Sequence, residues 1–167
     1  MRKTLVAAVL LLVPLLGTVP LRAQESGIAV GADAPVVTVR DLDGKAVDLG
    51  QYIGKKPVFL EFWATWCELC EELLPRVRAA RAAYGDQVEF LGVNVTVNQS
   101  RDRVRRYLEK HQPPFRTLYD EEGTSTRAYE VPATSYVVIV DRSGKIAYTG
   151  SGGAQEFDGV LRRITQN

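Results

Sequence analysis

The chain has 167 residues, of which 46% are hydrophobic, and this size suits one domain with a proper core. Its 21 basic and 20 acidic side chains almost balance, which argues against a nucleic-acid-binding protein, because such proteins carry a clear basic excess. Two cysteines and one histidine are too few to complete a four-ligand zinc site.

The first 23 residues have the features of an export signal. Arg2 and Lys3 precede an apolar stretch, residues 5–16, that is too short for a comfortable membrane span. We expect a signal peptide that is cleaved after Ala23. An uncleaved N-terminal anchor stays open as the alternative, because Leu21 is larger than the small residue usual at that place.

Residues 24–31 are a predicted tether, and one domain is expected over residues 32–167. It begins with a predicted hairpin, in which residues 34–39 and 46–49 flank an Asp-Gly turn. Residues 57–63 are a β-branched and aromatic run that predicts one buried strand.

A helix is predicted over residues 68–84, because apolar side chains recur at three- and four-residue spacing and Gly85 follows. Further strands are predicted at residues 87–95, 115–119, 136–140 and 145–149, and further helices at residues 100–111, 124–129 and 157–164. Ser100 suits the cap of its helix, whose four arginines are interpreted as a solvated face. The fold class is α/β, a central mixed sheet with helices on both faces.

Both cysteines lie where the strand at residues 57–63 gives way to the helix at residues 68–84. A first helical turn brings two thiols at this spacing within bonding range. Cys67 would occupy the helix N-terminus, where unpaired amides favour a thiolate, the species that attacks disulfides. Cys67 is therefore the predicted nucleophile and Cys70 the resolving thiol. A merely structural disulfide is the alternative.

The strand, the sequence Trp-Ala-Thr-Trp-Cys-Glu-Leu-Cys at residues 63–70 and the helix resemble the thioredoxin superfamily, specifically its exported TlpA/ResA-like branch. The resemblance covers residues 28–166. It implies a thioredoxin-like fold with an N-terminal hairpin and an extra helix-strand insertion at residues 99–118. The activity that it implies is thiol-disulfide exchange, with the Cys67–Cys70 disulfide as the redox group and no other cofactor or metal.

The same resemblance implies roles for four further residues. Glu61 falls where thioredoxins carry a buried acid, which burial keeps protonated and able to move a proton. Val131 and Pro132 fall in the cis-proline loop that receives substrate, and Trp66 is a substrate-binding candidate beside Cys67. Plain alternatives stay open: a solvent-facing Glu61, a trans Pro132 and a tryptophan that only packs.

The resemblance also has departures. Leu69 stands where TlpA-like proteins often have proline, and Leu73 stands where the ResA group has glutamate, so that acid is not carried over. Pro75 does match the proline that kinks the family's active-site helix.

Acidic side chains crowd the first turn after Cys67: Glu68, Glu71 and Glu72. They oppose a negative charge on Cys67, and a poorly stabilised thiolate makes a disulfide less oxidising. We therefore expect a reductase of protein disulfides.

Two other functions stay open on the sequence. A thiol peroxidase of the AhpC/TSA type shares the fold, but no proline lies in the loop before Cys67. A metallochaperone that binds Cu(I) through Cys67 and Cys70 would be expected to have a histidine near its site, and His111 is the only histidine.

The resemblance implies a location in the periplasm or on the outer face of the cytoplasmic membrane. Expected partners are protein disulfides, among them apocytochrome c in cytochrome c biogenesis or copper-site thiols, and a membrane electron donor. No nucleic-acid partner is expected.

Overall fold

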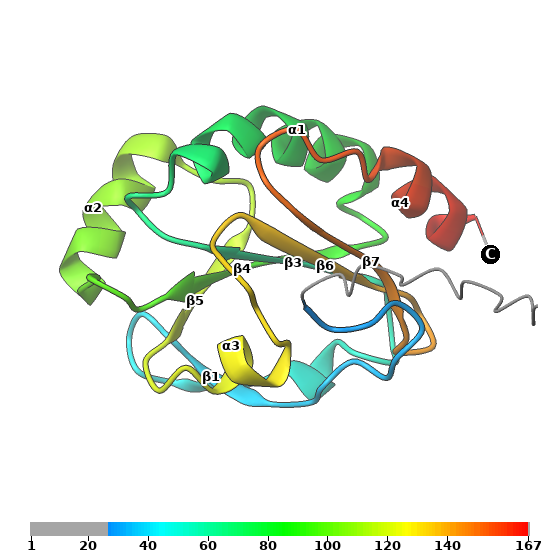
Figure 1. Ribbon diagram of the computed structural model, residues 1–167, viewed down its shortest axis with the longest axis horizontal. Helices are drawn as coiled ribbons and strands as arrows, with labels where there is room; N and C mark the ends of the chain where they lie inside the picture. Colours follow the sequence, from blue (N-terminus) through cyan, green and yellow to red (C-terminus); the bar gives the residue numbers. More distant parts are fainter. Residues whose placement is uncertain (1–26, 167) are drawn as a thin grey trace, which may run out of the picture.

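The computed structural model describes residues 27–166, which form one seven-stranded sheet with helices on both faces (Figure 1). The strands are β1 (Thr38–Asp41), β2 (Ala46–Asp48), β3 (Val58–Trp63), β4 (Glu89–Val95), β5 (Arg116–Asp120), β6 (Tyr136–Val140) and β7 (Ile146–Ser151). The helices are η1 (Leu49–Gln51), α1 (Glu68–Tyr84), α2 (Arg101–His111), α3 (Thr124–Ala128) and α4 (Asp158–Thr165). The predicted α/β fold is confirmed.

The strand order is β2-β1-β5-β4-β3-β6-β7, which makes β3 a central strand. β3 runs parallel to β4 and antiparallel to β6, and all six of its residues are buried. A strand buried on both faces needs a continuous apolar run, and residues 58–63 supply one apart from Glu61. The end of β3 in the sheet therefore positions the segment that carries the cysteine pair.

Two hydrophobic clusters lie on the two faces of the sheet. One includes Phe59 of β3 and lies under α1 and α4, with Leu73 and Phe157 packed there. The other includes Leu60 and Tyr129 and lies on the side of α3 and the N-terminal hairpin (Figure 1).

The predicted insertion corresponds to α2 and β5, and β1 pairs antiparallel with β5. α2 begins after Ser100, whose hydroxyl accepts the Arg103 amide as predicted for a cap. The Trp63 ring packs against Tyr107 of α2, with 5.2 Å between ring centroids. This contact places α2 beside the end of β3.

Two strand starts differ from the prediction by more than one residue. β1 begins at Thr38 rather than residue 34, because Pro35 has no amide hydrogen to donate to a ladder. β4 begins at Glu89 rather than residue 87, because the amides of Gln87 and Val88 both donate to Tyr84 O at the end of α1.

The predicted signal peptide or anchor, residues 1–23, lies outside the described residues. Within residues 27–166, no helix has the length and apolar character needed to cross a membrane.

Candidate redox site

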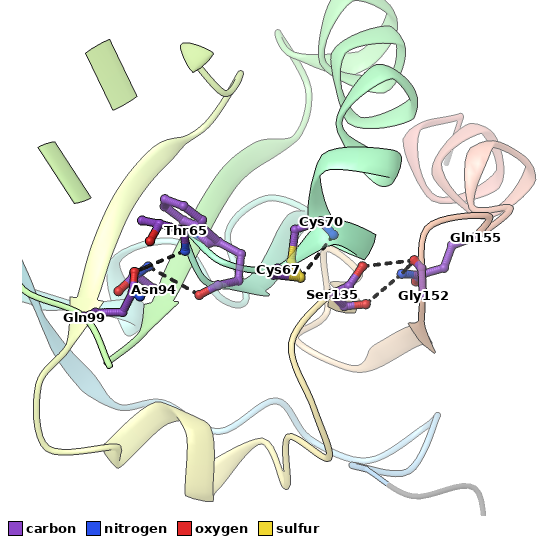
Figure 2. Close-up of a disulfide and its surroundings, with 9 residues drawn as sticks. Thr65, Cys67, Cys70, Asn94, Gln99, Ser135, Gly152 and Gln155 are labelled. Atoms are coloured by element: carbon purple, nitrogen blue, oxygen red, sulfur yellow. Dashed lines mark hydrogen bonds between the residues drawn. A yellow bond between two sulfur atoms is a disulfide. The ribbon is translucent and has the colours of Figure 1, made fainter. Parts of the chain in front are cut away.

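The cysteine pair lies at the N-terminus of α1 and forms a disulfide, with 5.3 Å between the two Cα atoms (Figure 2). Cys67 is the N-cap of α1, and its Sγ accepts a hydrogen bond from the Cys70 amide at 3.1 Å. After reduction, the same amide and the helix N-terminus would stabilise a thiolate on Cys67. This geometry agrees with the prediction that Cys67 is the nucleophile.

Exposure does not distinguish the two cysteines, because Cys67 is 6% and Cys70 is 5% exposed. The difference between them is the position in the helix. Cys70 lies within the first turn, where its amide already donates to the preceding cysteine. The cap position is therefore the feature that agrees with the predicted attacking role of Cys67.

Three large apolar side chains near the disulfide are exposed: Trp66 at 44%, Leu69 at 49% and Val97 at 63%. The Trp66 indole Nε1 donates to Val97 O at 2.9 Å, which joins the active-site loop to the loop after β4. Exposed apolar side chains around a reactive group suit a surface that binds a partner. The exposure of Trp66 is compatible with its predicted substrate-binding role, which stays a prediction.

Gln99 holds the active-site loop from the side of α2 (Figure 2). Its Oε1 accepts the Thr65 amide at 3.1 Å and the Asn94 side-chain amide at 3.5 Å. Asn94 is fully buried in β4 and also reaches Trp63 O at 3.4 Å. Sequence analysis missed both residues, because a polar residue at a strand end or in a loop has no periodic signal.

Glu61 is 2% exposed, and its Oε2 has no hydrogen-bond partner among the described residues. Burial raises the pKa of its carboxyl group to about 8. Strand alternation places Glu61 on the same face of β3 as Phe59, whose cluster lies under α1. The predicted buried acid is thus present beneath the helix that begins at Cys67, and the solvent-facing alternative is wrong.

The expected cis bond before Pro132 is wrong, because the described residues contain no cis peptide bond. Trans is the commoner state of any X-Pro bond. The chain turns here through positive φ angles at Glu130 and Ser135 instead. Pro132 is exposed, while Val131 packs against the cluster that includes both cysteines.

The strand that follows this loop is anchored next to the disulfide by Gln155, which sequence analysis also missed (Figure 2). Its Nε2 donates to Ser135 O at 2.9 Å and to Gly152 O at 2.7 Å. Ser135 Oγ donates to Gly152 O at 3.0 Å. These bonds hold the entry to β6 facing Cys67 and Cys70.

The acidic first turn of α1 is exposed at Glu68, Glu71 and Glu72. Glu71 lies near enough to Tyr107 to contribute to its pKa, which burial mainly raises to about 12. Leu73, at the position of the missing glutamate, is fully buried in the core. Pro75 lies inside α1 as predicted.

The comparisons with known proteins agree with this geometry. Residues 29–162 match the Redoxin family. Thiol-disulfide oxidoreductase ResA of Geobacillus thermodenitrificans is 33% identical over 124 residues, which are 74% of this chain and 70% of the relative. The thioredoxin-like protein YneN of Bacillus subtilis is 32% identical over 124 residues, 74% of this chain and 72% of the relative.

A solved thioredoxin domain of a thiol-disulfide oxidoreductase from Bacteroides vulgatus shares the fold, with a TM-score of 0.70 and 23% identity. The match covers 82% of this chain and 99% of that one. The thioredoxin-like fold is confirmed.

Proposed function

The chain belongs to the redoxin family, and from this premise we propose that it is an exported thiol-disulfide oxidoreductase that reduces protein disulfides. The observation that carries the proposal is the Cys67–Cys70 disulfide at the N-terminus of α1, where Cys67 Sγ accepts the Cys70 amide. A structural disulfide would need neither this cap geometry nor the exposed apolar side chains around it.

The reaction begins from the reduced protein. The Cys67 thiolate attacks one sulfur of a substrate disulfide, which forms a mixed disulfide and releases the other substrate sulfur as a thiolate. Cys70 then loses its proton and attacks the Cys67 sulfur, which releases the second substrate thiolate and closes the Cys67–Cys70 disulfide. Two electrons pass to the substrate, so a donor must reduce the protein again.

Glu61 is the proposed proton acceptor for Cys70. With a pKa of about 8, about a tenth of its carboxyl groups are ionised at pH 7, and each ionised group is a base whose pKa is close to that of a thiol. Trp66 and the loop at Val131 and Pro132 are the proposed substrate-binding residues.

The direction of the reaction is inferred from charge. Glu68, Glu71 and Glu72 surround the start of α1 and oppose a thiolate there. A less stable thiolate lowers the reduction potential of the disulfide, which suits a reductant.

We also propose a location in the periplasm or on the outer face of the cytoplasmic membrane, with a membrane dithiol as electron donor. ResA-type relatives and the charged, apolar start of the sequence support this location. Apocytochrome c and copper-site thiols are the proposed substrate classes.

A trapping experiment tests the proposal. In Cys70→Ser the mixed disulfide on Cys67 cannot be resolved, so envelope proteins should remain attached and be released by dithiothreitol. Cys67→Ser is the matched control and should trap none. Recovery of no disulfide-linked partner with Cys70→Ser, or an equal yield with the control, would contradict the proposal.

A further inference from the structure

A groove open to solvent runs along α2 next to the redox site. We call it the α2 groove; it has a volume of about 470 Å³, and its lining residues are Thr65, Arg103, Arg106, Tyr107, Lys110 and His111. Two of the lining side chains are aromatic rings: Tyr107 and His111 stack with 4.1 Å between ring centroids and 6° between ring planes. No lining residue is acidic.

The cations of the groove differ from the other arginines of α2. Arg101 pairs with Glu121, and Arg105 pairs with Asp43 and Asp102. These two arginines are therefore neutralised by neighbouring acids.

By contrast, Arg103, Arg106 and Lys110 are exposed and form no ion pair with any residue in the described range 27–166. Their spacing of three and four residues puts them on one face of the helix. The arginine-rich face of α2, which the sequence predicts to be solvated, therefore has two sides. Neighbouring acids neutralise one side, and the other side keeps its positive charge.

The groups around the groove leave its positive charge in place. Arg78 of α1 donates to His111 O at one end, which adds a further cation there. Glu71 and Glu61 are near enough to contribute to the raised pKa of Tyr107, which burial mainly causes, yet neither lines the groove. These two neighbouring carboxyl groups lie outside the lining, which itself carries three cations.

The groove is joined to the active-site loop. Arg103 Nε donates to Thr65 Oγ1 at 2.9 Å, and Thr65 precedes Cys67 by two residues. Two residues of chain span at most about 7 Å. A polypeptide whose sulfur is bonded to Cys67 can therefore extend into the groove within a few residues.

We propose that the α2 groove binds an extended acidic segment that flanks the cysteine of the protein substrate. This inference rests on the proposed function and adds to it the charge of the preferred substrate. Unpaired cations attract carboxylates and speed the encounter of complementary partners. The hydrogen bond from Arg103 to Thr65, two residues before Cys67, favours a peptide chain attached to Cys67 over a membrane surface.

The test uses the full-length reduced protein and short synthetic peptides. Each peptide has one cysteine held as a mixed disulfide with thionitrobenzoate, flanked by acidic, neutral or basic residues. Attack of Cys67 on the peptide sulfur releases the coloured thionitrobenzoate thiolate, and Cys70 then displaces the peptide thiol. The measured quantity is the ratio of the second-order rate constants for the acidic and the neutral peptide.

For the wild type we expect a ratio of about ten at about 50 mM salt, because exposed charges attract over about 10 Å at low ionic strength. The ratio should fall below about two at about 500 mM salt, where screening is strong. Arg106→Glu combined with Lys110→Glu should bring the ratio to about one or below at low salt.

The matched control combines Arg142→Glu and Arg163→Glu, which change the net charge equally. Both arginines are exposed and unpaired among the described residues, and α4, which carries Arg163, lies at the far end of the molecule from α2 (Figure 1). The control should keep the wild-type ratio. If the double glutamate variant at α2 is poorly folded, Arg106→Gln with Lys110→Gln should still lower the ratio.

Several results would overturn the inference. They are a wild-type ratio of one, an unchanged ratio in both α2 variants, or an equal fall in the control. Binding of the protein to phosphatidylserine vesicles through Arg106 and Lys110, with no change in the peptide ratio, would assign the groove to a membrane instead. Failure of the proposed function is distinguishable, because the wild type would then release thionitrobenzoate from no peptide.

Discussion

Glu61 is an ionisable residue that is buried. At most one of its two carboxyl oxygens has a hydrogen-bond partner. Its Oε2 has no hydrogen-bond partner in residues 27–166, and burial raises its pKa from 4.5 to about 8. A group in this state remains protonated in the folded protein at pH values where the unfolded chain has released the proton. Both stability and chemistry should therefore depend on pH through this residue.

The first prediction concerns stability. Below about pH 4.5 Glu61 is protonated in both states, and its contribution to the free energy of unfolding is fully present. Between about pH 4.5 and 8 the folded state binds more protons, so this free energy should fall by up to about 1.4 kcal/mol per pH unit. Glu61→Gln should remove this slope, and urea unfolding of the oxidised protein at several pH values measures it.

Glu109→Gln is the control for this measurement, because Glu109 is exposed on α2. The control should follow the wild-type pH dependence. Parallel curves for wild type and Glu61→Gln would contradict the buried, protonated state of Glu61.

The second prediction concerns the rate of exchange. If Glu61 accepts the Cys70 proton, the release of a mixed disulfide should accelerate as pH rises towards about 8. Glu61→Gln should slow this step at least about tenfold at pH 7 and remove the inflection near pH 8. Stopped-flow release of a peptide from Cys67 measures it, and an unchanged rate profile would exclude the proton-acceptor role.

The third prediction concerns Gln155, a buried amide that serves two carbonyl groups. Gln155→Ala leaves Ser135 O and Gly152 O without this donor, which should lower the free energy of unfolding by about 2 kcal/mol. Urea unfolding measures the change. Gln51→Ala is the control, since its exposed amide donates to Asp48 O and its loss should have little effect. Equal changes in the two variants would contradict the anchoring role.

Sequence patterns predicted some of the site and missed the rest for a physical reason. Cys67 and Cys70 were predicted from their spacing and the strand before them, and Glu61 was predicted from its place in the thioredoxin resemblance. Gln99 and Gln155 lie in connections between elements, and their partners are far along the chain. A single polar residue in such a place is indistinguishable from a solvated one until the fold brings its partner near.

Among the elements, β4 shows how closely the layers pack. A Cβ on Gly92 would overlap the Phe115 ring, so only glycine leaves room for this ring over the sheet. Gly92 also lies beside Glu61 in the pairing of β3 with β4. Because Gly92 has no side chain, the Phe115 ring can cover β4 next to Glu61.

The fourth prediction follows from this packing. Gly92→Ala should lower the free energy of unfolding by about 1 to 3 kcal/mol, because the core cannot accept another methyl group here without a shift. Gly159→Ala in α4 is the control: no atom lies near its added Cβ, so it should be neutral or stabilising by up to about 1 kcal/mol. Thermal unfolding distinguishes the two, and a neutral Gly92→Ala would contradict the close approach of Phe115.

Element boundaries were predicted best where two signals coincide. α1 has apolar spacing and a following glycine, and the predicted residues 68–84 are those observed. The start of β1 was misplaced because apolar residues 34–37 have strand propensity, while the proline at 35 prevents regular pairing. Strand pairing depends on a distant partner, so sequence pattern alone sets strand ends poorly.

The molecule as a whole carries opposite charges on adjacent helices. The start of α1 is acidic, and the α2 groove is basic, although the full sequence has a net charge of only +1. Composition could not predict this separation, because it depends on how the fold brings α1 and α2 together. The two helices meet at the hydrogen bond from Arg78 to His111 O. In our proposals, the acidic side disfavours a thiolate on Cys67, and the basic side contributes to the choice of partner.

The most direct test of the account is the equilibrium reduction potential of the Cys67–Cys70 disulfide, measured in the full-length protein against a series of glutathione or dithiothreitol buffers. We predict a value near or below about −230 mV, in the range of thioredoxin-like reductants. A value near about −120 mV would place the protein with the strong oxidants and contradict its proposed direction.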